Sequence, residues 1–130
     1  MDKLYQIARE NIKNSYSPYS KFPVSAVLEL KDGTLFKGVN IENAAYGLCN
    51  CAERSAIYAA YSQGVRKADI KQILVYTDHP YFVSPCGSCR QVLRELMEDD
   101  AKVILANNKG ETKTYKNADL LPAAFTEGDL

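Results

Sequence analysis

Hydrophobic and polar residues follow two different periods along this chain, and the changes between them divide it into predicted helices and strands. Residues 2–15 have the three-to-four-residue period of a surface helix, with a core-facing side made of Leu4, Ile7, Ala8, Asn11 and Ile12. Apolar or alternating runs predict strands at 24–30, 34–40, 71–78, 102–108 and 111–115. Further helices are predicted at 51–64 and 86–100, with a short last helix and a loop at 118–125.

The order of these elements, α-β-β-α-β-α-β-β-α, predicts an α/β fold in which helices pack on the faces of a sheet. The strand–helix–strand unit from 71 to 106 is expected to be parallel and right-handed. The first two strands and the last two have short connections, so each pair is expected to be antiparallel. The sequence therefore predicts a three-layer α/β/α sandwich around a five-stranded mixed sheet.

Composition fits one globular domain over residues 1–130 and narrows the kind of substrate. The chain is 46% hydrophobic, and its 16 basic and 16 acidic residues give a formal net charge of zero. Proteins that bind a nucleic-acid backbone usually carry an excess of basic residues. We therefore expect a small neutral substrate and no nucleic acid as partner.

The cellular compartment is predicted from features that the sequence lacks. No run approaches the length of a membrane span, and the charged N-terminal segment has no signal-peptide core. The sequence accordingly predicts a cytoplasmic protein without a membrane partner, in which thiols stay reduced. Its four cysteines form two clusters, at 49–51 and 86–89. In a reducing compartment, such clusters favour a metal site or chemistry over a disulfide framework.

Three of the cysteines stand where two predicted helices begin. Cys86 and Cys89 are three residues apart behind Pro85, so both thiols lie on one side of a first helical turn, and Cys51 starts the earlier helix. Helix N-termini favour thiolates over thiols. Two such helix starts brought together would offer three thiolates to one Zn²⁺ per chain, since zinc commonly takes tetrahedral sulfur ligation.

Whether Cys49 also binds the metal decides the class of protein. Four cysteine ligands would make a closed, structural zinc module that binds partners and catalyses nothing. Three protein ligands leave a position for water, as in a catalytic zinc site. Glu53 favours the open site, because a carboxylate two residues after Cys51 can serve as the base beside that water. Cys49 is then an ordinary buried or half-buried thiol.

Arg54 is expected to contact the metal site, whereas His79 is not. Three thiolates and Zn²⁺ sum to one negative charge, and a guanidinium that donates hydrogen bonds to the sulfurs withdraws charge from them. Arg54 directly follows Glu53 and fits that role. His79, the only histidine, lies in the loop TDHPYF and is expected to be a loop or surface residue without a metal role.

These residues carry a resemblance to a known family. CAE at 51–53 followed by PCGSC at 85–89 resembles the zinc deaminase signature. With NSYSPYSKFPVSA, GVNIENAAYGLCNCAER, SPCGSCRQVLREL and LLPAAF, the chain resembles the small cytidine deaminases that act on free nucleosides and form homotetramers. The resemblance covers nearly the whole chain. Ser25 is a departure, because the family most often has glycine at this position.

The resemblance implies a cytidine deaminase-like fold and a role for each matching position. It implies that Cys51, Cys86 and Cys89 hold the zinc, that Glu53 is the catalytic glutamate, and that Arg54 binds the ligand thiolates. The substrate-binding positions that it implies are Phe22, Asn40, Glu42, Ala44, Tyr46, Ala52, Ser84 and Phe125. Among these, Asn40 and Glu42 hold the ribose hydroxyls and Phe22 packs near the base. Ala44, Tyr46 and Phe125 belong to segments that a neighbouring subunit lends to the site.

The activity that the resemblance implies is hydrolysis of cytidine and 2′-deoxycytidine to the uridine nucleosides and ammonia by a zinc-bound hydroxide, in pyrimidine salvage. An enzyme of the same fold acting on a blasticidin-type compound, or on bases in single-stranded polynucleotide, is an alternative. The pair Asn40 and Glu42 favours a free ribose, because residues two apart on a strand face the same way and can share a sugar diol.

Overall fold

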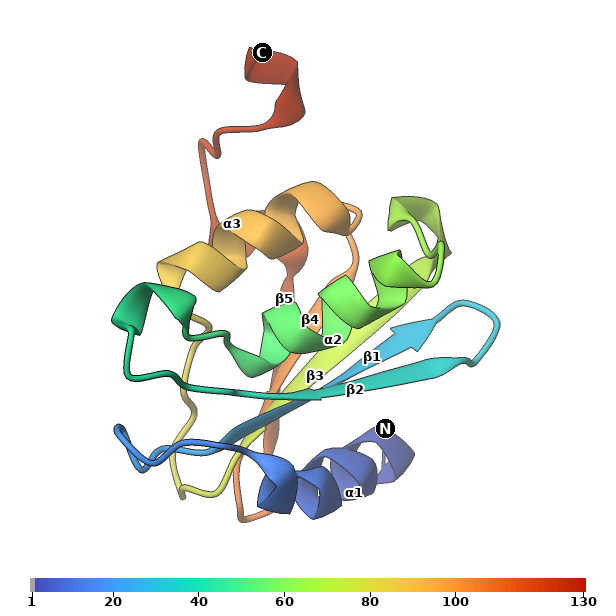
Figure 1. Cartoon of the computed structure of the whole chain (residues 1–130). Helices are drawn as coiled ribbons and strands as arrows, with labels where there is room; N and C mark the ends of the chain where they lie inside the picture. The colour runs from blue at the N-terminus through green and yellow to red at the C-terminus, as the bar shows by residue number, and fades with distance from the viewer. Residues whose placement is uncertain (1) are drawn as a thin grey trace.

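The computed structural model describes residues 2–130 and builds them around one five-stranded sheet (Figure 1). The helices are α1 (Asp2–Asn11), α2 (Ala52–Ser62) and α3 (Gly87–Leu96). The strands are β1 (Val24–Leu30), β2 (Leu35–Val39), β3 (Ile70–Thr77), β4 (Lys102–Ala106) and β5 (Thr112–Lys116). Short 3₁₀ turns are η1 (Ile12–Asn14), η2 (Tyr46–Leu48), η3 (Lys67–Asp69), η4 (Asn117–Leu120) and η5 (Glu127–Asp129). Within residues 2–130 no helix has the length and apolarity needed to cross a membrane.

The strands follow the order β2-β1-β3-β4-β5. The β3–β4 pair is parallel and every other neighbouring pair is antiparallel, which confirms the predicted mixed sheet. The sequence did not predict that β1 pairs with β3, in the register that sets Val24 beside Thr77. This pairing brings the start of β1 to the carboxyl end of β3, where a cavity opens.

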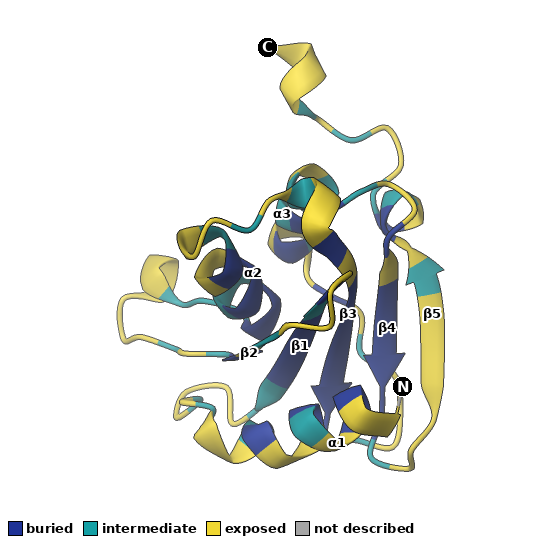
Figure 2. Ribbon diagram, turned by 90° about the vertical axis from the view of Figure 1, so that its right-hand side faces the viewer, coloured by how far each residue is buried: buried dark blue, intermediate teal, exposed yellow. Residues whose placement is uncertain are grey.

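Helices cover both faces of the sheet, as the three-layer prediction requires. The core under α1 includes Leu4, Ala8, Val27, Leu74 and Ile104. The core under α2 and α3 includes Ala56, Ile57, Ile73, Leu93 and Val103. In Figure 2 the central strands β1, β3 and β4 are mostly dark blue, whereas β5 at the edge is mostly exposed. Burial on both faces explains why β3 and β4 are continuous apolar runs.

Helix α2 approaches β2 unusually closely, and Gly38 makes this possible. A Cβ atom at Gly38 would lie 2.5 Å from the carbonyl oxygen of Ala52 and 2.5 Å from the amide nitrogen of Ala56. Only a residue without a side chain leaves room for backbone at that distance. The first turn of α2 therefore rests directly on the strand, and this contact sets the height of Cys51 and Glu53 above the sheet.

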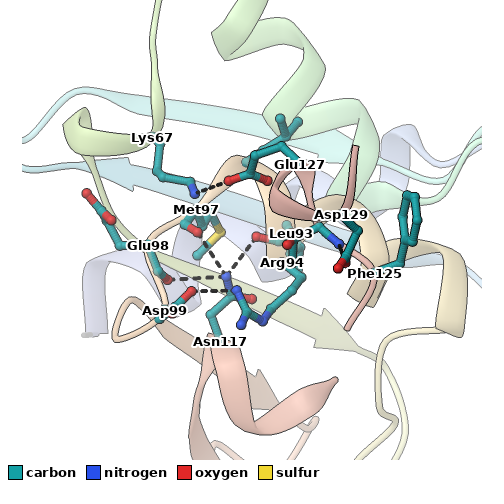
Figure 3. A network of polar contacts seen from close by, with 12 residues as sticks. Lys67, Leu93, Arg94, Met97, Glu98, Asp99, Asn117, Phe125, Glu127 and Asp129 are labelled. Carbon is teal, nitrogen blue, oxygen red and sulfur yellow. Dashed lines mark hydrogen bonds and ion pairs between the residues drawn. The ribbon is translucent and has the colours of Figure 1, made fainter. Parts of the chain in front are cut away.

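The helix predicted over 86–100 ends four residues early, at Leu96, so that boundary was wrong. Met97 is extended (φ −124°, ψ 156°). The side chain of Asn117 is buried and forms hydrogen bonds with the carbonyl oxygens at the end of α3 (Figure 3). Its Nδ2 donates to the carbonyl oxygens of Leu93, Met97 and Glu98, at 2.7, 3.3 and 3.2 Å. A side chain 20 residues downstream thus ends the helix, which local sequence could not indicate.

Other boundaries also differ from the predicted ones. The first helix becomes a 3₁₀ turn after Asn11 instead of continuing to residue 15. The predicted last helix at 118–125 is the short 3₁₀ turn η4 followed by a loop. The helix predicted over 51–64 ends at Ser62, two residues early, and Gly64 behind it adopts the left-handed conformation (φ 93°) that closes a helix.

Candidate active site

Three sulfur atoms meet where α2 and α3 begin. Cys51 is the N-cap of α2, Cys86 is the N-cap of α3, and Cys89 lies in the first turn of α3. Their Sγ atoms all lie within 4.8 Å of one another, and those of Cys51 and Cys86 are 3.7 Å apart. A tetrahedral zinc with Zn–S bonds of about 2.3 Å needs sulfurs about 3.8 Å apart. The donor set and its spacing therefore fit zinc.

Cys49 lies outside this group. Its half-buried thiol accepts a hydrogen bond from the backbone nitrogen of Asn43 at 3.3 Å and donates to the carbonyl oxygen of the same residue at 3.5 Å. All four cysteines are free thiols. The structure thus groups three sulfurs, which is the number that leaves one tetrahedral position for a non-protein ligand.

Cys51 and Cys89 do not ionise equally. A hydrogen bond from Cys89 and the guanidinium of Arg54 lower the pKa of Cys51 to about 5. The same contact with Cys51, together with burial, raises the pKa of Cys89. Arg54 Nη2 donates to Cys51 Sγ at 3.3 Å, and this hydrogen bond raises the pKa of the guanidinium. Crowded thiolates repel one another, so this group favours a bound cation and releases protons when it takes one.

Glu53 projects from the first turn of α2 into the cavity beside the sulfurs. The residue is only 4% exposed. Burial, and to a lesser extent the neighbouring Cys51 thiolate, raise the pKa of this carboxyl to about 7. A carboxyl with a pKa near neutrality can both accept and return a proton, which is the property that a general acid–base catalyst needs.

The cavity has a volume of about 260 Å³ and opens at the carboxyl end of β3. The residues that line it near the sulfurs are Cys51, Ala52, Glu53 and Cys86. It is also lined by Val24, Val75, Thr77, Val83, Ser84 and Pro85, and by Ser20, Phe22 and Asn40, which we call its mouth. Of the positions proposed from the sequence, the structure therefore brings Phe22, Asn40, Ala52 and Ser84 into one cavity with Glu53 and two of the sulfur ligands.

Asn40 and Glu42 hold the loop that forms the mouth of the cavity. Asn40 Nδ2 donates to the carbonyl oxygen of Phe22 at 2.9 Å, while its Oδ1 accepts from the backbone nitrogen of Val24 at 2.9 Å. The Glu42 carboxylate accepts from the backbone nitrogens of Tyr19 and Ser20 and from the Ser20 hydroxyl. These hydrogen bonds from Ser20 lower the pKa of Glu42.

Four other predicted substrate-binding positions do not line this cavity. Glu42 contacts the Ser20 loop beside it. Ala44 and Tyr46 are exposed, Tyr46 to 84%, and neither lines the cavity. Phe125 is also exposed, on the segment after η4, where its carbonyl oxygen accepts from Gln91 Nε2 at 2.8 Å. In this chain the side chains of Ala44, Tyr46 and Phe125 contribute nothing to the cavity that contains Glu53.

Sequence reasoning missed several residues that shape the site. Val75 and Thr77 line the cavity at the end of β3, and the rule that ligands bind at the carboxyl ends of strands could have indicated them. Arg90 was also missed. Its Nε donates to the carbonyl oxygen of Pro85 and its Nη1 to that of Leu120, both at 2.9 Å. Arg90 thereby fixes the turn in front of Cys86.

Comparisons with known proteins agree with the geometry. Residues 1–107 match the family described as cytidine and deoxycytidylate deaminase zinc-binding region. The chain is 49% identical over 118 residues to a cytidine deaminase of Halalkalibacterium halodurans, covering 91% of this chain and 88% of that protein. It is 45% identical over 130 residues to a cytidine deaminase of Sporosarcina psychrophila, covering 100% and 94%. The crystal structure of cytidine deaminase from Burkholderia pseudomallei gives a TM-score of 0.91 at 42% identity, covering 95% of this chain and 98% of that one.

Proposed function

This chain belongs to the cytidine and deoxycytidylate deaminase family, and we propose that it hydrolyses cytidine and 2′-deoxycytidine to the corresponding uridine nucleosides and ammonia. The observation that carries the proposal is the placement of Glu53. A buried carboxyl with a pKa of about 7 lies in the wall of a small cavity beside three sulfurs spaced for zinc. A structural zinc module has no use for such a group.

In the proposed mechanism Cys51, Cys86 and Cys89 hold the zinc, and Arg54 stabilises the Cys51 thiolate. When bound, zinc supplies Lewis-acid chemistry that lowers the pKa of a water molecule, so that a nucleophile is available at neutral pH. Glu53 takes a proton from that water and delivers it to N3 of the pyrimidine, which makes C4 electrophilic. The hydroxide that remains adds to C4. Glu53 then takes the proton of the new C4 hydroxyl and delivers it to the 4-amino group, so that the C4–N bond breaks, ammonia leaves and C4 keeps a carbonyl oxygen.

Residues at the mouth bind the rest of the nucleoside in this proposal. Phe22 packs against the base, and the ribose hydroxyls are bound by Asn40 in the cavity lining and by Glu42, which is hydrogen-bonded to the lining residue Ser20. Glu42 already accepts hydrogen bonds from loop residues, but a carboxylate has about four acceptor positions, so it can take a hydroxyl in addition. The carbonyl oxygen of Ser84, in the cavity wall, lies near the departing amino group.

We also propose that residues 1–130 act as one catalytic unit within a homotetramer, in which neighbours complete each site with Ala44, Tyr46 and Phe125. The exposure of large apolar side chains supports this. Ile41, Tyr46 and Leu48 are 50%, 84% and 71% exposed on one short segment, and Phe125 is 58% exposed. Such surfaces usually mark an interface. We further propose that the protein is cytoplasmic and that it acts in pyrimidine salvage.

A substrate panel tests the activity directly. Purified protein with its zinc content measured is incubated with cytidine, 2′-deoxycytidine, cytosine, CMP, a blasticidin-type compound and a cytosine-containing oligonucleotide, and ammonia release is followed. We expect release from the two nucleosides. Release from the blasticidin-type compound or the oligonucleotide alone would replace the proposed substrate, and zinc-loaded protein with no activity on the panel would contradict the proposal. Size-exclusion chromatography with light scattering tests the tetramer.

A further inference from the structure

His79 does not lie free in its loop: its ring stacks on that of Phe22. The two ring centroids are 4.5 Å apart and the planes differ by only 14°. Phe22 lines the cavity, whereas His79 does not. His79 therefore stands directly behind an aromatic wall of the site, on a loop that the sequence did not connect with Phe22.

A third ring extends this stack toward the surface. Tyr81 lies 5.1 Å from His79 between centroids, at an angle of 33°, and is itself 55% exposed. The imidazole thus contacts an aromatic ring on either side, Phe22 toward the cavity and Tyr81 toward solvent. Stacked arrangements of this kind stabilise beyond the area they bury.

The loop that carries His79 is fixed to the sheet scaffold. The carbonyl oxygen of His79 accepts from the backbone nitrogen of Asn108 at 2.9 Å. The carbonyl oxygen of Pro80 accepts from Nδ2 of Asn107 at 3.1 Å. Asn107 is 1% exposed, and its own carbonyl oxygen accepts from the hydroxyl of Tyr5 on α1. The backbone of this loop is therefore fixed, and the imidazole itself is held between two rings, those of Phe22 and Tyr81.

Phe22, by contrast, is held firmly only in its backbone. Lys21 before it has a positive φ of 55°, and the Phe22 carbonyl oxygen accepts from Asn40 Nδ2. These features fix the backbone at Phe22. The χ1 and χ2 angles of its side chain then depend on the groups that contact the ring. The ring stacked on it is that of His79.

We infer that His79 is a positioning residue for the proposed deamination: by stacking on Phe22 it fixes the plane of the aromatic wall against which the nucleoside base packs. The inference rests on the proposed function and assigns no chemical step to the imidazole. Loss of the stack lets the Phe22 ring occupy other rotamers, so binding weakens while the chemistry at Glu53 stays intact. From the energy of an aromatic pair we expect an effect of about two- to tenfold on KM.

Steady-state kinetics with cytidine test this in three variants. His79→Ala is expected to raise KM two- to tenfold with kcat within twofold of wild type. His79→Phe keeps a flat aromatic ring and should return KM to near the wild-type value. Phe82→Ala is the matched control, because it removes an aromatic side chain from the same loop outside the stack. An unchanged KM in His79→Ala, or a His79→Phe variant as impaired as His79→Ala, would overturn the inference.

A spectroscopic readout separates this inference from the proposed function. The chain has one histidine, so its imidazole signals in a proton–carbon NMR spectrum need no assignment. Ring current from Phe22 should displace them, and Phe22→Ala should move them toward unstacked values. If the wild type releases no ammonia from cytidine, the proposed function fails while this measurement still decides on the stack. Histidine signals unaffected by Phe22→Ala would contradict the stack itself.

Discussion

The two ends of the cavity are built on opposite principles. At the metal end, Cys51, Glu53 and Cys89 come from helix starts that pack on a buried sheet. The other end, here called the sugar end because the proposed ribose contacts lie there, includes Phe22 and Glu42. Its loops are joined mainly by hydrogen bonds between side chains of one loop and the backbone of the other. Packing fixes the first end before any ligand arrives, whereas the second depends on polar contacts that a ligand can share. We therefore expect substitutions at the metal end to affect the chemistry and those at the sugar end to affect binding.

The largest effect is expected from Glu53→Ala. Because this carboxyl is proposed to move both protons, kcat for cytidine should fall by about 10²–10⁴-fold or more. Zinc should stay at one ion per chain, because the three sulfurs remain. Ammonia release and elemental analysis of the same sample measure both quantities. Wild-type turnover in this variant would refute the assignment of the base.

A paired cysteine exchange tests which sulfurs belong to the metal end. Cys51→Ser removes a member of the three-sulfur group, so zinc per chain and activity should both fall sharply. Cys49→Ser is the matched control two residues away, whose thiol contacts only Asn43 in the structure, and it should retain one zinc. Loss of zinc from the control would point to a four-cysteine structural clamp instead.

Gly38→Ala tests whether packing fixes the metal end. The added methyl group would collide with backbone atoms of α2 at 2.5 Å, and overpacking of this kind costs about 1–3 kcal/mol of unfolding free energy. Since α2 carries Glu53, kcat should fall as well. Gly128→Ala is the control, because its Cβ would meet its neighbour at an ordinary 3.5 Å. Chemical denaturation and kinetics are measured on both, and a Gly38→Ala variant as stable and active as wild type would contradict the close contact.

The smallest effect is expected at the sugar end. Glu42→Gln keeps the shape of the side chain but weakens its hydrogen bonds, so KM for cytidine should rise about fivefold, or about 1 kcal/mol, with little change in kcat. 2′,3′-Dideoxycytidine lacks the hydroxyls that Glu42 is proposed to bind, and its KM should change less. Equal changes for both nucleosides would mean that Glu42 acts only by holding the Ser20 loop.

The same contrast explains which features could be predicted from the sequence. Helix starts marked by Pro85 and by cysteine spacing placed the three sulfurs and Glu53 correctly beside one another. The alternation of helices and strands predicted the mixed sheet. These features depend on local periodicity, which a sequence displays directly.

The features that escaped prediction are made by residues far apart in the chain. Asn117 ends α3 from 20 residues downstream, and β1 pairs with β3 across an intervening helix. His79 contacts Phe22 from 57 residues away. It lies in a loop, as predicted, but its stacking behind the cavity wall was not predicted. Nothing in the local pattern around any of these residues encodes the distant partner.

The position of α1 bears on the order in which the chain folds during synthesis. Tyr5 donates to the carbonyl oxygen of Asn107, and α1 packs on Leu74 and Ile104. Helix α1 is therefore synthesised long before β4, and its apolar face is fully covered only when β1, β3 and β4 have all been made. The β1–β2 hairpin can form early, but until β4 follows, the apolar face of α1 stays partly open to chaperones.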